Sequence, residues 1–186
     1  VPEAEVAKCA AIESPTNRLV CFDGLAKSRQ LDRPKTETTA SGKWILTKDK
    51  SKIDDSETVT LFLRAENEIE GWHKRQTPAL VLRCQESKTN VFVVTGMPPN
   101  VEYGNHNGAT ATVRLDSKKA QSASMEKSTD SNALFFDNPI PFIKSMVGHS
   151  KMLFQFTPFN ASPVIVEFDI AGLDAPLKDL RTTCRW

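Results

Sequence analysis

The sequence predicts an α+β fold that is mainly β: an antiparallel β-sandwich or curled sheet, with an N-terminal helical hairpin and a short C-terminal helix. Apolar residues recur at helical spacing in residues 1–30 and again at the end of the chain. Between them, about eight short segments rich in β-branched and aromatic residues alternate with turn signals. We therefore expect a disulfide-stapled helical hairpin at 1–30, a linker at 31–42, and an antiparallel β domain at 43–186 with one inserted helix and a closing helix.

The N-terminal hairpin is predicted from two apolar stripes separated by a helix start signal. The first stripe covers residues 6–12 and the second covers residues 19–26. Between them, Ser14 followed by Pro15 is typical of an N-cap residue and the first residue of a helix. The second helix is expected to end near Gln30. Helices this short are marginal alone, so the hairpin needs a clamp.

The cysteines supply that clamp. Four cysteines allow three pairings, and their spacing favours Cys9 with Cys21, which leaves Cys84 with Cys184. In a chain-entropy account the short bridge stabilises by about 3 kcal/mol, and a bridge that closes about 100 residues by up to about 4.7 kcal/mol. The alternative is that Cys9 and Cys21 are free and buried. An even count without C-x-x-C spacing is typical of an oxidising compartment rather than of a zinc or redox site.

Charge and hydropathy exclude several classes of partner. The formal net charge is +1, so there is no electrostatic case for nucleic acid or an anionic membrane as partner. No apolar run is long enough to span a bilayer. The abrupt start VPEAEVAKC is the form expected of a mature chain whose signal peptide has been removed. Together with the cysteines, this start predicts an exported, periplasmic protein.

The strands of the β domain are predicted from alternating hydropathy between turn signals. Segments 31–42, 47–57 and 66–78 are polar and are expected to be a linker, a charged loop and an exposed connection. Strands are expected at 44–46, 58–65, 79–84, 90–96, 110–115, 151–159 and 163–170. The segment 122–127 is a candidate for a further short strand, and 133–136 is a short apolar segment.

Two helices are expected within the second half of the chain. The segment 139–151 begins with prolines at Pro139 and Pro141 and contains Gly148, which is typical of a helix end. The closing helix is expected to turn three leucines towards the core, namely Leu173, Leu177 and Leu180. A bridge from Cys84 to Cys184 would then pin this helix to the central hairpin of strands.

Catalytic residues, metal ligands and cofactors are not expected. Asp54 and Asp55, near Asp49 and Glu57, offer the oxygen ligands that Ca²⁺ prefers but lack EF-hand spacing, so a solvated loop is the favoured interpretation over a weak ion site. The histidines, His73, His106 and His149, lie on separate segments without zinc-ligand spacing. Gly148-His149-Ser150 is not a nucleophile elbow, because a strand rather than a helix is expected after it.

Candidate binding residues are Trp72, Arg83, Arg114 and Asp116. The charged residues lie on or at the end of predicted strands, where the simplest interpretation is a solvated outer face of the sheet with some ion pairs. A second interpretation is a buried Arg–Asp pair, or a small groove for a peptide or glycan. Trp72 lies within a polar connection, where a tryptophan can serve as a contact anchor for a partner.

The ordered motifs of the chain resemble the VasI/TagO family of type VI secretion system-associated proteins. The opening stretch 9–23, CAAIESPTNRLVCFD, carries the family's cysteine, short helix and Arg-Leu-x-Cys-aromatic-Asp pattern. Val113-Arg114-Leu115-Asp116 and the closing Cys184-Arg185-Trp186 resemble later family segments. The resemblance implies a non-catalytic periplasmic accessory protein with protein partners in the cell envelope, and with peptidoglycan as a further candidate partner. A cell-wall-acting enzyme, or a phage-derived envelope factor or inhibitor, remains the alternative.

Overall fold

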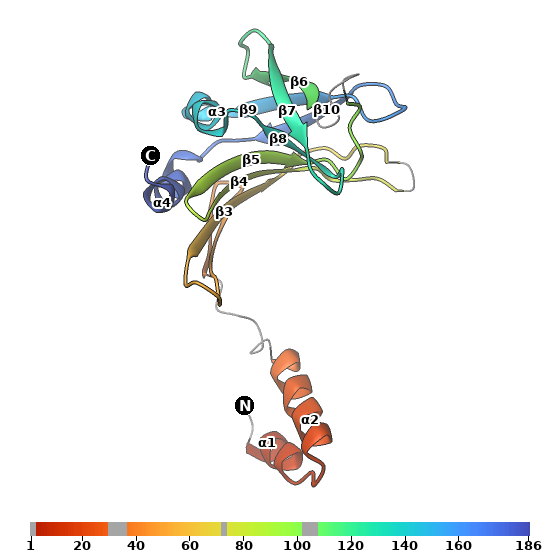
Figure 1. Cartoon of the computed structure of the whole chain (residues 1–186), viewed down its shortest axis with the longest axis vertical. Coiled ribbons are helices and arrows are strands. Elements are labelled where there is room, and N and C mark those ends of the chain that lie inside the picture. Colours follow the sequence, from red (N-terminus) through yellow and green to blue (C-terminus); the bar gives the residue numbers. More distant parts are fainter. Residues whose placement is uncertain (1–2, 30–36, 72–73, 102–107) are drawn as a thin grey trace. The chain divides into compact units, whose positions relative to one another are not determined.

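A computed structural model of the chain describes residues 3–29, 37–71, 74–101 and 108–186. The chain divides into two compact units, residues 1–36 and 37–186 (Figure 1). Among the described helices, none combines the length and the hydropathy that a bilayer crossing requires.

The first unit is the helical hairpin. Helix α1 spans Glu3–Ala10 and helix α2 spans Pro15–Ser28, and Ser14 is the N-cap of α2, its hydroxyl accepting from the amide of Asn17 at 3.5 Å. A disulfide between Cys9 and Cys21 joins the two helices. Cys9 is the one hydrophobic residue that is fully buried in the described part of this unit, so the hairpin has almost no core of its own.

The second unit is built on one antiparallel sheet of ten strands, which confirms the curled-sheet form of the predicted fold class (Figure 1). The strand order is β1-β2-β3-β4-β5-β8-β7-β6-β9-β10. The strands are β1 (Glu37–Ser41), β2 (Trp44–Lys50), β3 (Glu57–Arg64), β4 (Ala79–Gln85), β5 (Lys88–Val94), β6 (Gly108–Leu115), β7 (Gln121–Lys127), β8 (Ala133–Phe136), β9 (Lys151–Phe156) and β10 (Val164–Asp169).

The sheet curls until its last strand reaches the connection that follows β3. The amide of Glu66 donates to the carbonyl of Glu167 at 2.8 Å. The side-chain amide of Asn67 donates to the carbonyl of Ile165 at 3.0 Å and accepts from the amide of Glu167 at 2.8 Å. Asn67 therefore hydrogen-bonds to β10 as a neighbouring strand would, and these contacts satisfy polar groups at that edge of the sheet.

Alternation along the strands sorts the side chains into a concave core and an outer face. In β3 the buried residues are Val59, Leu61 and Leu63, and β9 contributes its own alternate positions in the same way. Trp44 is 0% exposed and donates its indole N–H to the carbonyl of Ile170 at 3.2 Å. That bond satisfies the one polar group of a side chain that is otherwise buried among hydrocarbon.

Two helices cover parts of the core. Helix α3 (Pro139–Met146) buries Ile143 and Met146, and helix α4 (Asp174–Cys184) buries its leucine-bearing face as predicted. A disulfide from Cys84 on β4 to Cys184 at the end of α4 ties that helix to the sheet. Leu173, Leu177 and Leu180 are 1%, 4% and 0% exposed.

Three details of the sheet differ from the sequence-based expectation. Residues 37–41 form β1 although they were expected to be linker, and residues 47–50 extend β2 although they were expected to be loop. Both segments pair near one edge of the sheet, where backbone hydrogen bonds can form without a buried side-chain pattern. Residues 133–136 form β8, and with β1 and β8 the sheet has ten strands rather than about eight. Residues 31–36 lie outside the described residues.

Candidate functional site

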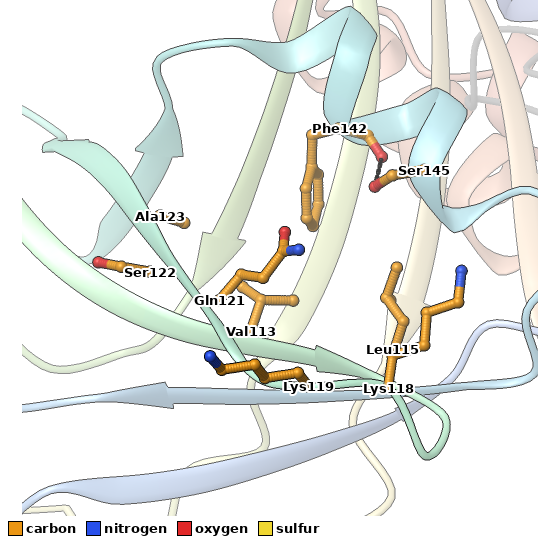
Figure 2. A pocket seen from close by; sticks show the side chains of 9 residues that line it. All are labelled: Val113, Leu115, Lys118, Lys119, Gln121, Ser122, Ala123, Phe142 and Ser145. Carbon is orange, nitrogen blue, oxygen red and sulfur yellow. Dashed lines mark hydrogen bonds between the residues drawn. The ribbon is translucent and has the colours of Figure 1, made fainter.

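A small cavity lies between the β6–β7 hairpin and α3 (Figure 2). Its volume is about 240 Å³. The apolar part of its lining is made by Val113, Leu115, Ala123 and Phe142, and the polar part by Lys118, Lys119, Gln121, Ser122 and Ser145. Figure 2 shows Phe142 reaching down from α3 towards Gln121 and Val113, while both lysines stand at the end of the hairpin.

The register of the hairpin explains why these residues meet. Val113 is directly opposite Gln121 across the β6–β7 pair, and Ala111 is opposite Ala123. Val113 and Leu115 are two residues apart and therefore lie on the same face of β6. Beyond Leu115 the chain turns at Asp116, whose φ is 48°, and this turn brings both lysines back beside the apolar strip.

Helix α3 forms the wall of the cavity opposite the hairpin, because two of its residues are anchored in the core. Ile143 and Met146 are fully buried, which directs the neighbouring Phe142 and Ser145 sideways to the hairpin. The ring of Phe142 stacks on Phe136 with centroids 3.8 Å apart and an interplanar angle of 16°. The aromatic wall of the cavity is therefore held by packing on β8 before any ligand arrives.

The size and lining of the cavity limit what it can receive. Cavities that enclose small-molecule ligands usually measure about 300–1,000 Å³. At about 240 Å³ this cavity is smaller, and it suits a single bulky side chain. Its apolar wall would bury such a side chain, and its lysine, glutamine and serine groups would hydrogen-bond the backbone that carries it. This is the geometry of an anchor pocket at a protein interface.

Beside the cavity, three side chains form a chain of hydrogen bonds. Asp116 Oδ2 lies 2.6 Å from His149 Nδ1, and Lys118 Nζ lies 2.8 Å from His149 Nε2. An ammonium can only donate, so the imidazole accepts at Nε2 and carries its proton on Nδ1. Both ring nitrogens are therefore engaged, and Lys118 is fixed at the rim of the cavity.

Asp116 is also the anchor of the loop that follows α3. Its Oδ1 accepts from the backbone amides of Ser150 at 3.1 Å and Lys151 at 2.8 Å. The hydrogen bond from His149, followed by that from the amide of Lys151, lowers the pKa of the Asp116 carboxyl below its ordinary value. The ionised carboxylate thus clasps the end of the β6–β7 hairpin to the start of β9.

This cluster does not have the arrangement of a nucleophilic active site. A catalytic histidine needs a free nitrogen facing a hydroxyl or thiol. His149 uses both nitrogens for Asp116 and Lys118, and the nearby Ser145 hydroxyl donates to the carbonyl of Phe142 at 2.7 Å. The arrangement can hold two loops together and position a lysine.

The structure does not gather the candidate binding residues into one groove. Arg83 lies on β4 and Arg114 on β6, and β5, β8 and β7 run between those strands. Arg83 donates to Asn90 Oδ1 at 3.4 Å and lies 5.3 Å from the ring centroid of Phe92, so its described partners do not include an aspartate. Asp116 is the candidate that adjoins the cavity, and Trp72 lies outside the described residues.

The acidic loop has a local structural explanation. Asp54 Oδ1 accepts from the hydroxyl of Ser56 at 2.8 Å, and Asp55 Oδ1 lies 2.8 Å from Lys50 Nζ. Hydrogen bonds from Ser51 and then Ser56 lower the pKa of Asp54. Within residues 3–29, 37–71, 74–101 and 108–186, no group of three or more His, Cys, Asp or Glu side chains is placed to hold a metal ion. His73 and His106 lie outside these ranges.

Both cysteine pairs favoured by the spacing are at bonding distance. The S–S distances are 2.00 Å for Cys9–Cys21 and 2.04 Å for Cys84–Cys184. The described part of the chain contains no free cysteine.

Several cavity residues were not singled out from the sequence. Lys118, Lys119 and Phe142 are not among the candidate binding residues selected from the sequence. A doubled lysine next to alternating apolar residues was the available signal. It could not locate the aromatic wall, since Phe142 comes from a separate element.

Comparison with known proteins adds a family and a fold. The family profile described as Type VI secretion system VasI, EvfG, VC_A0118 matches residues 8–186. Among solved structures, the crystal structure of invasion associated protein B from Bartonella henselae is similar with a TM-score of 0.53 and 9% sequence identity, covering 81% of this chain and 99% of that chain. At that identity the likeness concerns the fold alone. A comparison with curated proteins finds no significant match.

Proposed function

Because the chain belongs to the VasI family of type VI secretion system proteins, we propose that it is a non-catalytic accessory protein that binds a protein partner in the periplasm. The observation that carries this proposal is the cavity between the β6–β7 hairpin and α3. Its volume of about 240 Å³, apolar wall and polar rim suit one anchoring side chain of a partner.

The two disulfides support the periplasmic part of the proposal. Structural disulfides persist in oxidising compartments such as the bacterial periplasm and are rare in the cytosol. The hairpin in particular has almost no core, so it depends on the Cys9–Cys21 bridge. A reducing compartment would leave this unit marginal.

The bonding of His149 supports the non-catalytic part. Its two ring nitrogens are bonded to Asp116 and Lys118, and Asp116 holds two backbone amides as well. A cell-wall-acting enzyme remains the competing function, and this Asp–His pair is its strongest structural support. A phage-derived envelope factor or inhibitor would use the same cavity but would not depend on secretion genes.

Filling the cavity tests the proposal. Ala123 lines the cavity and Ala120 is exposed outside it, so Ala123→Phe and Ala120→Phe add the same side chain to one hairpin in two places. In a strain lacking the gene, secretion-dependent killing of a neighbouring strain should be restored by wild type and by Ala120→Phe. It should not be restored by Ala123→Phe, provided that the purified variant keeps its thermal melting temperature.

Two results would contradict the proposal. Equal complementation by both variants would show that the cavity is not used. Release of muropeptides from purified peptidoglycan by the wild type, abolished by Asp116→Asn, would show that the chain is an enzyme. Periplasmic location is tested separately, by recovery of the chain in an osmotic-shock fraction together with a periplasmic marker.

A further inference from the structure

Helix α4 has two chemically distinct faces. One face is buried through Leu177, Leu180 and Cys184. On the other, Lys178, Arg181 and Thr182 follow the spacing i, i+3 and i+4, which places them along one stripe of the helix. Arg185, the C-cap residue just past the helix, lines the same surface depression, and all four residues, which we call the stripe, are exposed.

Trp186 closes this stripe at its C-terminal end. The guanidinium of Arg181 lies 5.3 Å from the centroid of the indole ring, and Lys144 Nζ, from α3, lies 5.7 Å from it. The indole N–H donates to Thr89 Oγ1 at 2.8 Å, which fixes the ring against β5. The aromatic ring therefore gathers cations from two helices at one place.

These cations have no ion-pair partner among the described side chains. None of Lys144, Lys178, Arg181 and Arg185 takes part in an ion pair among the described residues. By contrast, Lys48 on β2 lies 2.9 Å from Asp179, on the flank of the same helix. The whole chain has 24 basic and 23 acidic residues, so this excess of positive charge is a local feature.

Helix stability alone does not account for the stripe. A helix dipole favours cations at the C-terminal end of a helix, which covers Arg181 in the last turn and Arg185 at the C-cap at best. Lys178 stands in the middle of α4 and Lys144 belongs to another helix. Like charges three or four residues apart on a helix repel each other by a few tenths of a kcal/mol. The cations thus gather in spite of their mutual repulsion.

The surface around the stripe is slightly hollow. An open depression of about 470 Å³ is lined by Lys178, Arg181, Thr182, Arg185 and Trp186. It is separate from the cavity of the candidate site, because α3 contributes Phe142 and Ser145 to that cavity and Lys144 to the indole.

We infer that this face of α4, with Trp186 and Lys144, is a second docking surface, and that it binds an acidic segment of a protein partner. The planar guanidinium of Arg181 matches a carboxylate in a bidentate pair, and its Nε is the nitrogen already used, for the main-chain oxygen of Trp186 at 3.2 Å. Thr182 places a hydroxyl beside the cations. A short run of Asp and Glu side chains would meet Lys178, Arg181 and Arg185 in succession.

Acidic groups beside the stripe favour a short peptide segment over an extended anionic surface. Asp174 begins α4, Asp179 lies on its flank, and Glu57 lies 3.5 Å from the Thr183 hydroxyl. A phospholipid bilayer or a nucleic acid would bring phosphates against these carboxylates as well as against the cations. A segment that follows only the stripe avoids that repulsion.

The inference is tested with a fluorescein-labelled hexaglutamate peptide in an anisotropy titration at low ionic strength. The wild-type chain should bind the peptide saturably. Added salt should dissociate the peptide, because exposed charge contacts are screened. The variant Lys178→Gln with Arg185→Gln should bind it about tenfold more weakly, the sum expected for two exposed charge pairs. Neither side chain is buried, so the variant should melt with the wild type.

A matched control removes two positive charges elsewhere. Lys52→Gln with Lys74→Gln changes the net charge equally at two exposed sites, and it should bind hexaglutamate as the wild type does. Equal weakening by both double variants, or no saturable binding of hexaglutamate by the wild type, would overturn the inference. So would tighter binding to phosphatidylglycerol vesicles than to the peptide. Ala123→Phe should leave binding of hexaglutamate unchanged. The docking surface on α4 and the cavity of the proposed function can therefore fail independently.

Discussion

Removing the Cys84–Cys184 disulfide should destabilise the β domain far more than removing Cys9–Cys21. The two bridges have sequence separations of 100 and 12 residues. In the chain-entropy account these loops are worth about 4.7 and about 3 kcal/mol. The longer bridge also joins two parts of the core, since Cys84 is 0% and Cys184 9% exposed. Its loss would free α4, which buries Leu177 and Leu180.

The shorter bridge acts on a unit whose described residues are absent from that core cluster. In the hairpin, Leu19 and Val20 are 61% and 64% exposed, and they add little burial to its stability. The hairpin also forms a compact unit apart from residues 37–186. Cys9→Ala with Cys21→Ala should therefore loosen the hairpin and leave the sheet intact.

The assay compares thermal melts and limited proteolysis of the two double variants. For a domain of this size, 1 kcal/mol shifts the melting temperature by about 2–4 °C. Cys84→Ala with Cys184→Ala should accordingly lower it by about 10–20 °C. Cys9→Ala with Cys21→Ala should leave the β signal and its melting temperature in place while a protease-sensitive site is gained before residue 42.

The opposite pattern would refute this reasoning. If the Cys9/Cys21 variant unfolds globally while the Cys84/Cys184 variant melts with the wild type, then the hairpin is part of the core. The division of the chain into a thin hairpin and a self-sufficient sheet would then be wrong.

Three further predictions concern the clasp, the sheet edge and the thiols. Hydrogen bonds lower the pKa of Asp116 in the folded state. The stability that its ionised carboxylate contributes is therefore present above the unfolded-state pKa of about 3.9, and it is lost as the pH falls through the lower folded-state pKa. Asp116→Asn should therefore be less stable than wild type in urea melts at pH 7, and the difference in free energy of unfolding should disappear below about pH 4. A difference that stays constant with pH would show that the ionised Asp116 does not hold the two loops together. Asn67→Ala removes two hydrogen bonds to β10 and should lower the free energy of unfolding by about 1–3 kcal/mol. It should also increase aggregation in light scattering, because the edge of β10 is then unpaired. An unchanged melt would show that these hydrogen bonds do not stabilise the edge. Thiol titration of the denatured, unreduced chain should find none of the four cysteines free, and four free thiols would end the case for export.

The fold class followed from the sequence because its determinants are local. Ser14 and Pro15 start α2 by their own chemistry, and alternation in 58–65 is enough to specify a half-buried strand. The prediction was wrong where the segment is polar, as in β1 and in the second half of β2. There the partner strand, and not the segment's own residues, decides the structure.

The order of strands was beyond the reach of sequence patterns. β8 is inserted between β5 and β7, and β9 returns to pair with β6. For the same reason the cavity could not be predicted. Asp116 and His149 are 33 residues apart in the chain, and Phe142 reaches the β6–β7 hairpin only because α3 is anchored in the core. Asp116 was selected as a charged strand end, and its role as a clasp depends on that tertiary contact.

Site-specific photo-crosslinking from the cavity tests the central claim most directly, in the bacterium that encodes the chain. A photoreactive phenylalanine analogue is placed at Gln121, which lines the cavity, or at Lys52, which is exposed and outside it. The account predicts a discrete adduct in the periplasmic fraction from Gln121 alone, lost when Ala123→Phe fills the cavity and absent when the other type VI secretion genes are deleted. The same adduct from both positions, or an adduct from Gln121 that persists without those genes, would contradict it.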